Sequence, residues 1–326
     1  MKALALPLLA LLLPSCALRD STDEPDEGDD DLVLFEFNSA VDRLAVGTEL
    51  EVGYTATAAF RLASSDPSVL EAQEEEGGLI RLVARSPGIA SLRAESADGS
   101  RELAALPIEV APAEAIELYF RTGPVASEPI DRLVALRDTT ESIRVVYRDG
   151  NGEVLAGRGA FSATGDGVAI ADAELVEGRI SEVFEPGFAV PLSFGAAGQG
   201  EVTAELPGLS ASIPIELVAA PAEIELVAMV LRDDVLVAAD QVVVSEPIGV
   251  DVVGRTAEGR FVGGVTGSWT TSLPVDVWFD PGPSSSEIVF SIESATRVGV
   301  TATVETADGT LAATRELTAE EPPPAR

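Results

Sequence analysis

Residues 106–118 read LPIEVAPAEAIEL, and residues 213–226 read IPIELVAAPAEIEL. Ile108 and Ile215 stand 107 residues apart, and Gly152 and Gly259 keep the same spacing. In each copy apolar residues alternate with polar ones, which is the period-two pattern of a half-buried β-strand. A unit of this length that recurs in register predicts similar domains in tandem.

The same alternation runs through the rest of the chain after residue 31. One example is Leu50, Val52 and Tyr54, and no long helical stripe interrupts it. Glycine, proline and Asp-Gly turns separate the strands, and a closing hairpin at 88–99 is echoed at 200–208 and at 299–309. We therefore predict an all-β fold with three domains at 32–111, 112–219 and 220–318, followed by a disordered tail at 319–326.

Short motifs relate these domains to a known family. The stretches 64–70 (SSDPSVL), 79–84 (LIRLVA) and 86–94 (SPGIASLRA) resemble the "big-two" pattern of bacterial immunoglobulin-like domains. The second and third copies are similar to invasin-type relatives. The resemblance implies three immunoglobulin-like β-sandwiches in which an aromatic residue on a central strand (Phe60, Phe161 or Trp269) fills the space between the sheets.

The N-terminus has the pattern of an export signal. Lys2 precedes an apolar run at 3–13 that is too short to span a bilayer. The sequence LPSC at 13–16 resembles a bacterial lipobox, which implies a signal peptide at 1–15 and a lipid on Cys16 that holds the chain to a membrane. Ala17 after the cysteine favours the outer membrane in lipoproteins of this kind. The alternative is cleavage after Ala17, which would release a secreted protein.

The charge of the chain is strongly negative. It has 55 acidic and 21 basic residues, a net charge of −34. Eight of the twelve residues from 20 to 31 are acidic, so we expect 16–31 to form a disordered tether. Nucleic acid would be repelled by such a chain.

Composition excludes most catalytic chemistry. The chain has no histidine, Lys2 is its single lysine and Cys16 its single cysteine. Triads with a histidine base, Schiff-base lysines, the usual zinc sites and internal disulfides are therefore ruled out. We expect a protein that is not an enzyme and has no cofactor; carboxylate catalysis and calcium binding are what the composition leaves open.

Asp149, Asn151 and Glu153 place side-chain oxygens at alternate positions, as the beginning of a calcium loop does. The later acidic ligand of such a loop is missing. Glycines at 150 and 152 suit a tight hairpin turn, so we favour the turn and keep calcium as the alternative.

Trp278 lies between Asp276 and Asp280 in the third domain. If Val275, Val277 and Phe279 point inward, Trp278 points outward between the two carboxylates. Exposed aromatic rings flanked by acids are typical of sugar-binding surfaces; the alternative is a tryptophan that covers an edge or a neighbouring domain.

The sequence thus favours an envelope lipoprotein that projects immunoglobulin-like domains for adhesion to a protein or glycan partner. A carbohydrate-binding protein that acts through the third domain is one alternative, and a structural spacer without a specific ligand is another.

Overall fold

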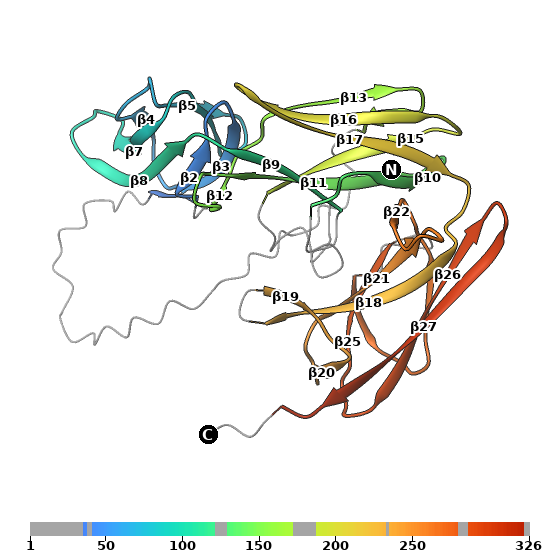
Figure 1. Cartoon of the computed structure of the whole chain (residues 1–326). Coiled ribbons are helices and arrows are strands. Elements are labelled where there is room, and N and C mark those ends of the chain that lie inside the picture. The colour runs from blue at the N-terminus through green and yellow to red at the C-terminus, as the bar shows by residue number, and fades with distance from the viewer. Residues whose placement is uncertain are drawn as a thin grey trace, which may run out of the picture. The chain divides into compact units, whose positions relative to one another are not determined.

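The computed structural model describes residues 35–37, 41–120, 129–171, 187–232, 235–279 and 286–322. In these ranges the regular elements are β-strands (Figure 1), and no helix there is long and apolar enough to cross a membrane. The predicted all-β class is confirmed. The strands form sandwiches around three separate hydrophobic cores, and we call these sandwiches the first, second and third domain.

The first domain consists of two four-stranded sheets, with the strand orders β1-β3-β6-β5 and β2-β8-β7-β4. Its strands are β1 Phe35–Phe37, β2 Arg43–Ala45, β3 Glu49–Ala56, β4 Phe60–Ser64, β5 Leu70–Glu75, β6 Leu79–Ala84, β7 Gly88–Ser96 and β8 Glu102–Ala111. The alternation read from the sequence is visible in β6, where Ile80, Leu82 and Ala84 are buried and the residues between them are half-buried.

In the second domain, one sheet has the order β12-β11-β15-β14, and β9 also pairs with β11. The other sheet begins β13-β16-β17-β10. The strands are β9 Ala115–Phe120, β10 Leu133–Leu136, β11 Thr140–Arg148, β12 Val154–Leu155, β13 Ala160–Gly165, β14 Val168–Ile170, β15 Phe188–Phe194, β16 Gln199–Leu206 and β17 Leu209–Val218.

The third domain continues the second sheet of the second domain, because β22 pairs with β10 and leads to β21, β18 and β19, with β25 and β24 beyond β21. Its own second sheet has the order β20-β27-β26-β23. The strands are β18 Glu223–Arg232, β19 Val235–Ala238, β20 Gln241–Val243, β21 Ile248–Arg255, β22 Phe261–Gly263, β23 Ser268–Thr271, β24 Asp276–Phe279, β25 Glu287–Ser291, β26 Arg297–Thr306 and β27 Gly309–Glu320.

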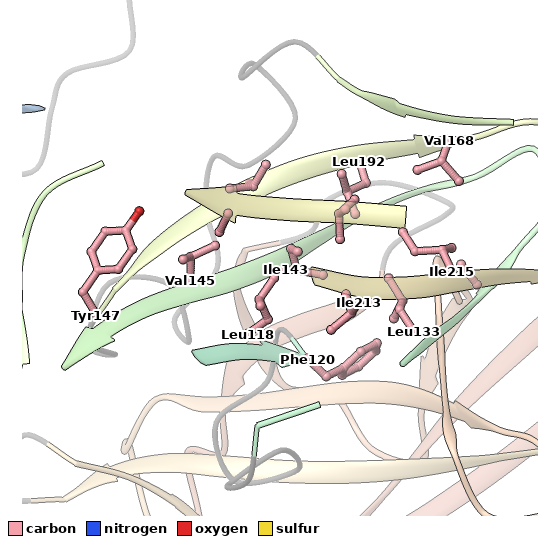
Figure 2. Close-up of a cluster of buried hydrophobic side chains, with 14 of the residues drawn as sticks. Leu118, Phe120, Leu133, Ile143, Val145, Tyr147, Val168, Leu192, Ile213 and Ile215 are labelled. Carbon is pink, nitrogen blue, oxygen red and sulfur yellow. The ribbon is translucent and has the colours of Figure 1, made fainter. Parts of the chain in front are cut away.

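Each core is made of the inward residues of two facing sheets. Figure 2 shows the core of the second domain, in which Ile143 and Val145 of β11 and Ile213 and Ile215 of β17 belong to one cluster of buried side chains. The buried Tyr147 also belongs to this core, and its hydroxyl accepts a 3.0 Å hydrogen bond from the Gly159 N–H. Burial raises the pKa of Tyr147, so the phenol stays protonated.

The aromatic residues expected between the sheets occupy equivalent places, but on edge strands rather than central ones. Phe60, Phe161 and Trp269 lie in β4, β13 and β23, each the last strand of its sheet path. All three are half-buried against the core of their own domain. The expectation of a central strand was wrong because sequence alternation identifies a strand and its faces but not its position within a sheet.

Candidate functional site: the junctions between the domains

The residues that the sequence singled out are distributed over described and undescribed parts of the chain. Cys16, the signal peptide at 1–15, the tether at 16–31 and Asp280 lie outside the described residues, as do the side chains of Asp276 and Trp278. The lipid anchor and the glycan site therefore stay predictions.

The alternation that placed Trp278 outward is wrong at Val277, which was expected to point inward and is 42% exposed. Val277 pairs with Phe290 and Phe279 pairs with Val289, so one extra residue of β24 lies between these pairs. A β-bulge of this kind breaks the period-two relation between sequence and sheet face.

The calcium candidates come together in a tight turn between β11 and β12. The Asp149 carboxylate accepts the backbone N–H groups of Asn151 and Glu153, both at 2.9 Å. Gly152 has a φ of +81°, a left-handed conformation that favours glycine. These bonds are those of the hairpin turn that the sequence favoured.

The positively charged side chain of an arginine from the first domain lies beside these carboxylates. The guanidinium of Arg43, in β2, is 2.7 Å from Asp149, 2.5 Å from Glu153 and 3.0 Å from Glu109. The side chains of Arg43 and Asp149 are 19% and 8% exposed. The Arg43 hydrogen bond holds the pKa of Asp149 below its usual range, and its carboxylate partners raise the pKa of Arg43. Within the described ranges no group of three or more histidine, cysteine, aspartate or glutamate residues is arranged to hold a metal.

Backbone pairing joins the first and second domains beside this ion cluster. The Ala45 N–H donates to the Ala156 carbonyl and the Ala156 N–H to the Arg43 carbonyl, both at 3.0 Å. Glu49 and Arg158 exchange two further backbone hydrogen bonds of 3.0 and 2.7 Å. This junction is therefore a short β-ladder in addition to a salt-bridge cluster.

A close backbone approach completes the first junction. Thr48 is fully buried, and its hydroxyl donates to the Ala45 carbonyl at 2.7 Å. Gly157 faces it with a φ of +104°, and a Cβ at this glycine would lie 2.1 Å from the Thr48 Oγ1. Side chains larger than glycine do not fit here without moving the two domains apart.

The second junction, between the second and third domains, repeats this arrangement. The hairpin that docks on the preceding domain is β11–β12 at the first junction and β21–β22 at the second, and equivalent residues of the two hairpins stand 107 positions apart. Ala135 of β10 pairs with Gly263 of β22, as Leu44 pairs with Ala156. The Thr139 hydroxyl donates to the Leu136 carbonyl at 2.7 Å, and a Cβ at Gly264 (φ +76°) would lie 2.0 Å from the Thr139 Oγ1. The same geometry therefore connects both pairs of successive domains.

The two docking hairpins, β11–β12 and β21–β22, are stabilised by equivalent arginine contacts. In each, an arginine of the central strand contacts a glutamate on the neighbouring strand and donates to the carbonyl of the turn glycine. The distances are 2.6 Å for Arg148 to Glu117, 2.9 Å for Arg148 to Gly152, 2.7 Å for Arg255 to Glu225 and 2.9 Å for Arg255 to Gly259.

The chemistry that fills the two junctions differs. At the second, buried Val134 takes the place of Arg43. The Glu141 carboxylate, 5% exposed, accepts the Gly264 N–H at 3.0 Å, and Phe120 stacks on Phe261 with 5.1 Å between the ring centroids. The first junction is thus ionic and the second is largely apolar.

Both junctions border surface clefts of mixed charge. The cleft at the first has a volume of about 730 Å³, and its wall includes Arg81, Arg158 and Glu49; Arg81 pairs with Glu49. The cleft at the second has a volume of about 590 Å³ and includes Arg132 and Glu216, which lie 3.8 Å apart.

Sequence reasoning missed the junction residues. A usable signal was present: the threonines Thr48 and Thr139 precede the alternating strands that are equivalent in the first and second domains, and glycines Gly157 and Gly264 stand 107 residues apart. Such glycines mark close approaches of backbone, but their partners are not readable from the repeat itself.

Comparison with known proteins places the chain among distant structures. No protein-family model and no curated protein matches it. Domains 4–9 of the surface layer protein SbsC are 14% identical, with 89% of this chain and 48% of that chain covered and a TM-score of 0.37. The chain thus spans about half the length of that S-layer structure.

Two further structures are described as a bacterial integrin-binding protein and as an adhesin. Invasin, a bacterial integrin-binding protein, is 12% identical, with 89% of this chain and 59% of that chain covered and a TM-score of 0.25. The Escherichia coli adhesin FdeC is 14% identical, with 88% and 96% covered and a TM-score of 0.23.

Proposed function

We propose that the chain is a non-enzymatic protein of the bacterial cell envelope, anchored through a lipid on Cys16, which displays its immunoglobulin-like domains for adhesion to another protein. One observation carries the display role: the two junctions have the same construction. Each combines backbone pairing between successive domains with a close contact of a threonine and a glycine. We infer that these contacts limit bending between the domains, which would suit a protein that presents a distal binding surface.

The composition supports the absence of catalysis. The mature chain would have no lysine, histidine or second cysteine, and its described clefts combine arginines with carboxylates that lie at the joints. The acidic tether after Cys16 would keep the first domain clear of the membrane, since like charges at 20–31 repel one another and extend the segment.

The anchor is tested in the native host. Mass spectrometry of the N-terminal peptide is expected to find a diacylated or triacylated Cys16, and Cys16→Ser is expected to move the protein from the membrane fraction to the soluble fraction. A mature chain that begins at Leu18 would contradict the anchor. Protease treatment of intact cells then distinguishes the two sides of the envelope: degradation supports surface display, and full protection contradicts it.

The display role is tested separately from the anchor. Cells that carry the native protein are expected to bind a partner surface through the third domain, and Gly157→Ala, which disturbs the first junction, is expected to reduce this adhesion while the amount of protein at the surface is unchanged. Gly152→Ala, in the same hairpin but facing open space, is the matched control. Equal adhesion by both variants would contradict a role for the junctions.

A further inference from the structure

The turn that follows β2 and β10 at the two junctions occurs a third time, after β20 in the third domain. The residue after each strand donates its N–H to the last strand of its own domain. These bonds are Val46 to Ala111 at 2.9 Å, Arg137 to Val218 at 3.0 Å and Val244 to Glu320 at 3.0 Å.

The backbone conformation of the turn is also the same. The next residue has a positive φ in each copy: +83° at Gly47, +57° at Asp138 and +65° at Ser245. In the described ranges Asp138 and Ser245 are the two non-glycine residues with positive φ. Because this conformation is costly for residues with a Cβ, its presence at both positions shows that the turn itself is imposed by the fold.

One residue distinguishes the third copy. The position of Thr48 and Thr139 is taken by Glu246. At the first junction the Thr48 hydroxyl bonds to a carbonyl, and the Ala45 N–H is left to pair with the following domain. In the third domain the Glu246 carboxylate itself accepts the N–H of Val243, the equivalent of Ala45, at 2.9 Å.

The larger side chain also changes the space at this edge. At both junctions a glycine of the following domain lies so close to the threonine that even a Cβ would be 2.0–2.1 Å from the hydroxyl oxygen. A glutamate has two more heavy atoms than threonine, so an approach of this kind to Glu246 is blocked. β20 is an outer strand in the sheet order of the described residues, where an uncapped edge would offer a template for another strand.

We propose that Glu246 closes a third copy of the junction: its contact with the Val243 N–H is an internal cap that prevents a β-hairpin of another immunoglobulin-like domain from pairing with β20. The occupant excluded is a hairpin of the type formed by β11–β12 and β21–β22. The first domain of a second copy does not supply one, because its β3 leads directly to β4 without an intervening strand. The inference concerns the sheet edge at β20 and does not depend on the lipid anchor.

The effect of the glutamate can be tested in the full chain by placing one at the second junction, where β22 pairs with β10. In Thr139→Glu, the backbone amide of Gly263, which is equivalent to Ala156 at the first junction, is expected to exchange with solvent at least tenfold faster than in the native protein. Thr139→Val removes the hydroxyl without adding a carboxylate, and we expect less than a threefold change. Unchanged protection of the β11–β15 amides reports that the second domain remains folded. Equal exchange at the junction in the two variants would overturn the proposal.

Removal of the cap gives the converse result. In Glu246→Thr, the Val243 amide is expected to exchange at least tenfold faster, whereas Glu246→Gln keeps a side-chain oxygen that can accept this N–H and stays within threefold of the native rate. A Glu246→Thr protein whose Val243 amide stays protected refutes the cap.

Discussion

Replacement of Gly157 by alanine tests whether close backbone contact holds the first two domains together. Gly157 and Gly152 lie in the same hairpin region, and both have left-handed φ values, +104° and +81°. Alanine at either position costs about 1–2 kcal/mol of backbone strain. At Gly152 nothing lies within 4 Å of the added Cβ, so that strain is the whole expected effect.

At Gly157 a second cost is added. The new Cβ would lie 2.1 Å from the Thr48 Oγ1 and 2.6 Å from the Thr48 Cβ, and it must retreat by about 1.5 Å to reach an ordinary contact distance. This movement breaks or lengthens the backbone hydrogen bonds between Ala45 and Ala156 and between Glu49 and Arg158. At about 1 kcal/mol for each bond, we expect an extra loss of about 2–4 kcal/mol at the junction.

Amide hydrogen exchange measures this loss locally. The Ala45 and Ala156 amides, which donate across the junction, are expected to lose protection by about thirty- to several-hundred-fold more in Gly157→Ala than in Gly152→Ala, since 1.4 kcal/mol corresponds to a factor of ten. Amides of the β16–β17 ladder serve as the internal reference. If the two variants lose junction protection equally, the close approach does not hold the domains together and the reasoning is wrong.

Three further changes test the electrostatics and polar contacts. Because Arg43 depresses the pKa of Asp149, that carboxylate stabilises the fold above its unfolded pKa of about 3.9 and loses the effect as pH falls through its lower folded pKa. Exchange at the first junction should therefore rise below about pH 4. In Arg43→Gln this acid step should become smaller, with the backbone hydrogen bonds from Asn151 and Glu153 left to lower the pKa of Asp149. Glu141→Ala removes the carboxylate that accepts the buried Gly264 N–H and should weaken the second junction by about 1–3 kcal/mol, measured by exchange of that amide. Glu141→Gln keeps an acceptor and should cost less. Tyr147→Phe removes the acceptor of one backbone N–H and should lower the stability of the second domain by about 1 kcal/mol in thermal unfolding; an unchanged melting temperature would contradict that contribution.

Much of the fold was predictable because strand patterning is local. The alternation in residues 79–84 and the 107-residue repeat identify the strands and their recurrence without any knowledge of their partners. The turn at Asp149 was predictable for the same reason, since Gly-Asn-Gly adopts its conformation from neighbouring residues alone. Prediction was wrong at Val277, where a bulge interrupts the period, and for Phe60, Phe161 and Trp269, whose place at sheet edges depends on strand order.

The sequence by itself determined the class of the protein: alternation and turns specify β-sandwiches, the repeat specifies their recurrence, and the lack of histidine and of lysine beyond Lys2 excludes most catalytic chemistry. The tertiary structure alone decided what lies between the domains. Arg43 meets Asp149 across 106 residues of chain, and Thr48 meets Gly157 across 109, because the short β2 strand pairs on one side with its own domain and on the other with the next. Such contacts depend on the register of paired strands, and a local pattern fixes which face a side chain takes but not which strand will lie beside it.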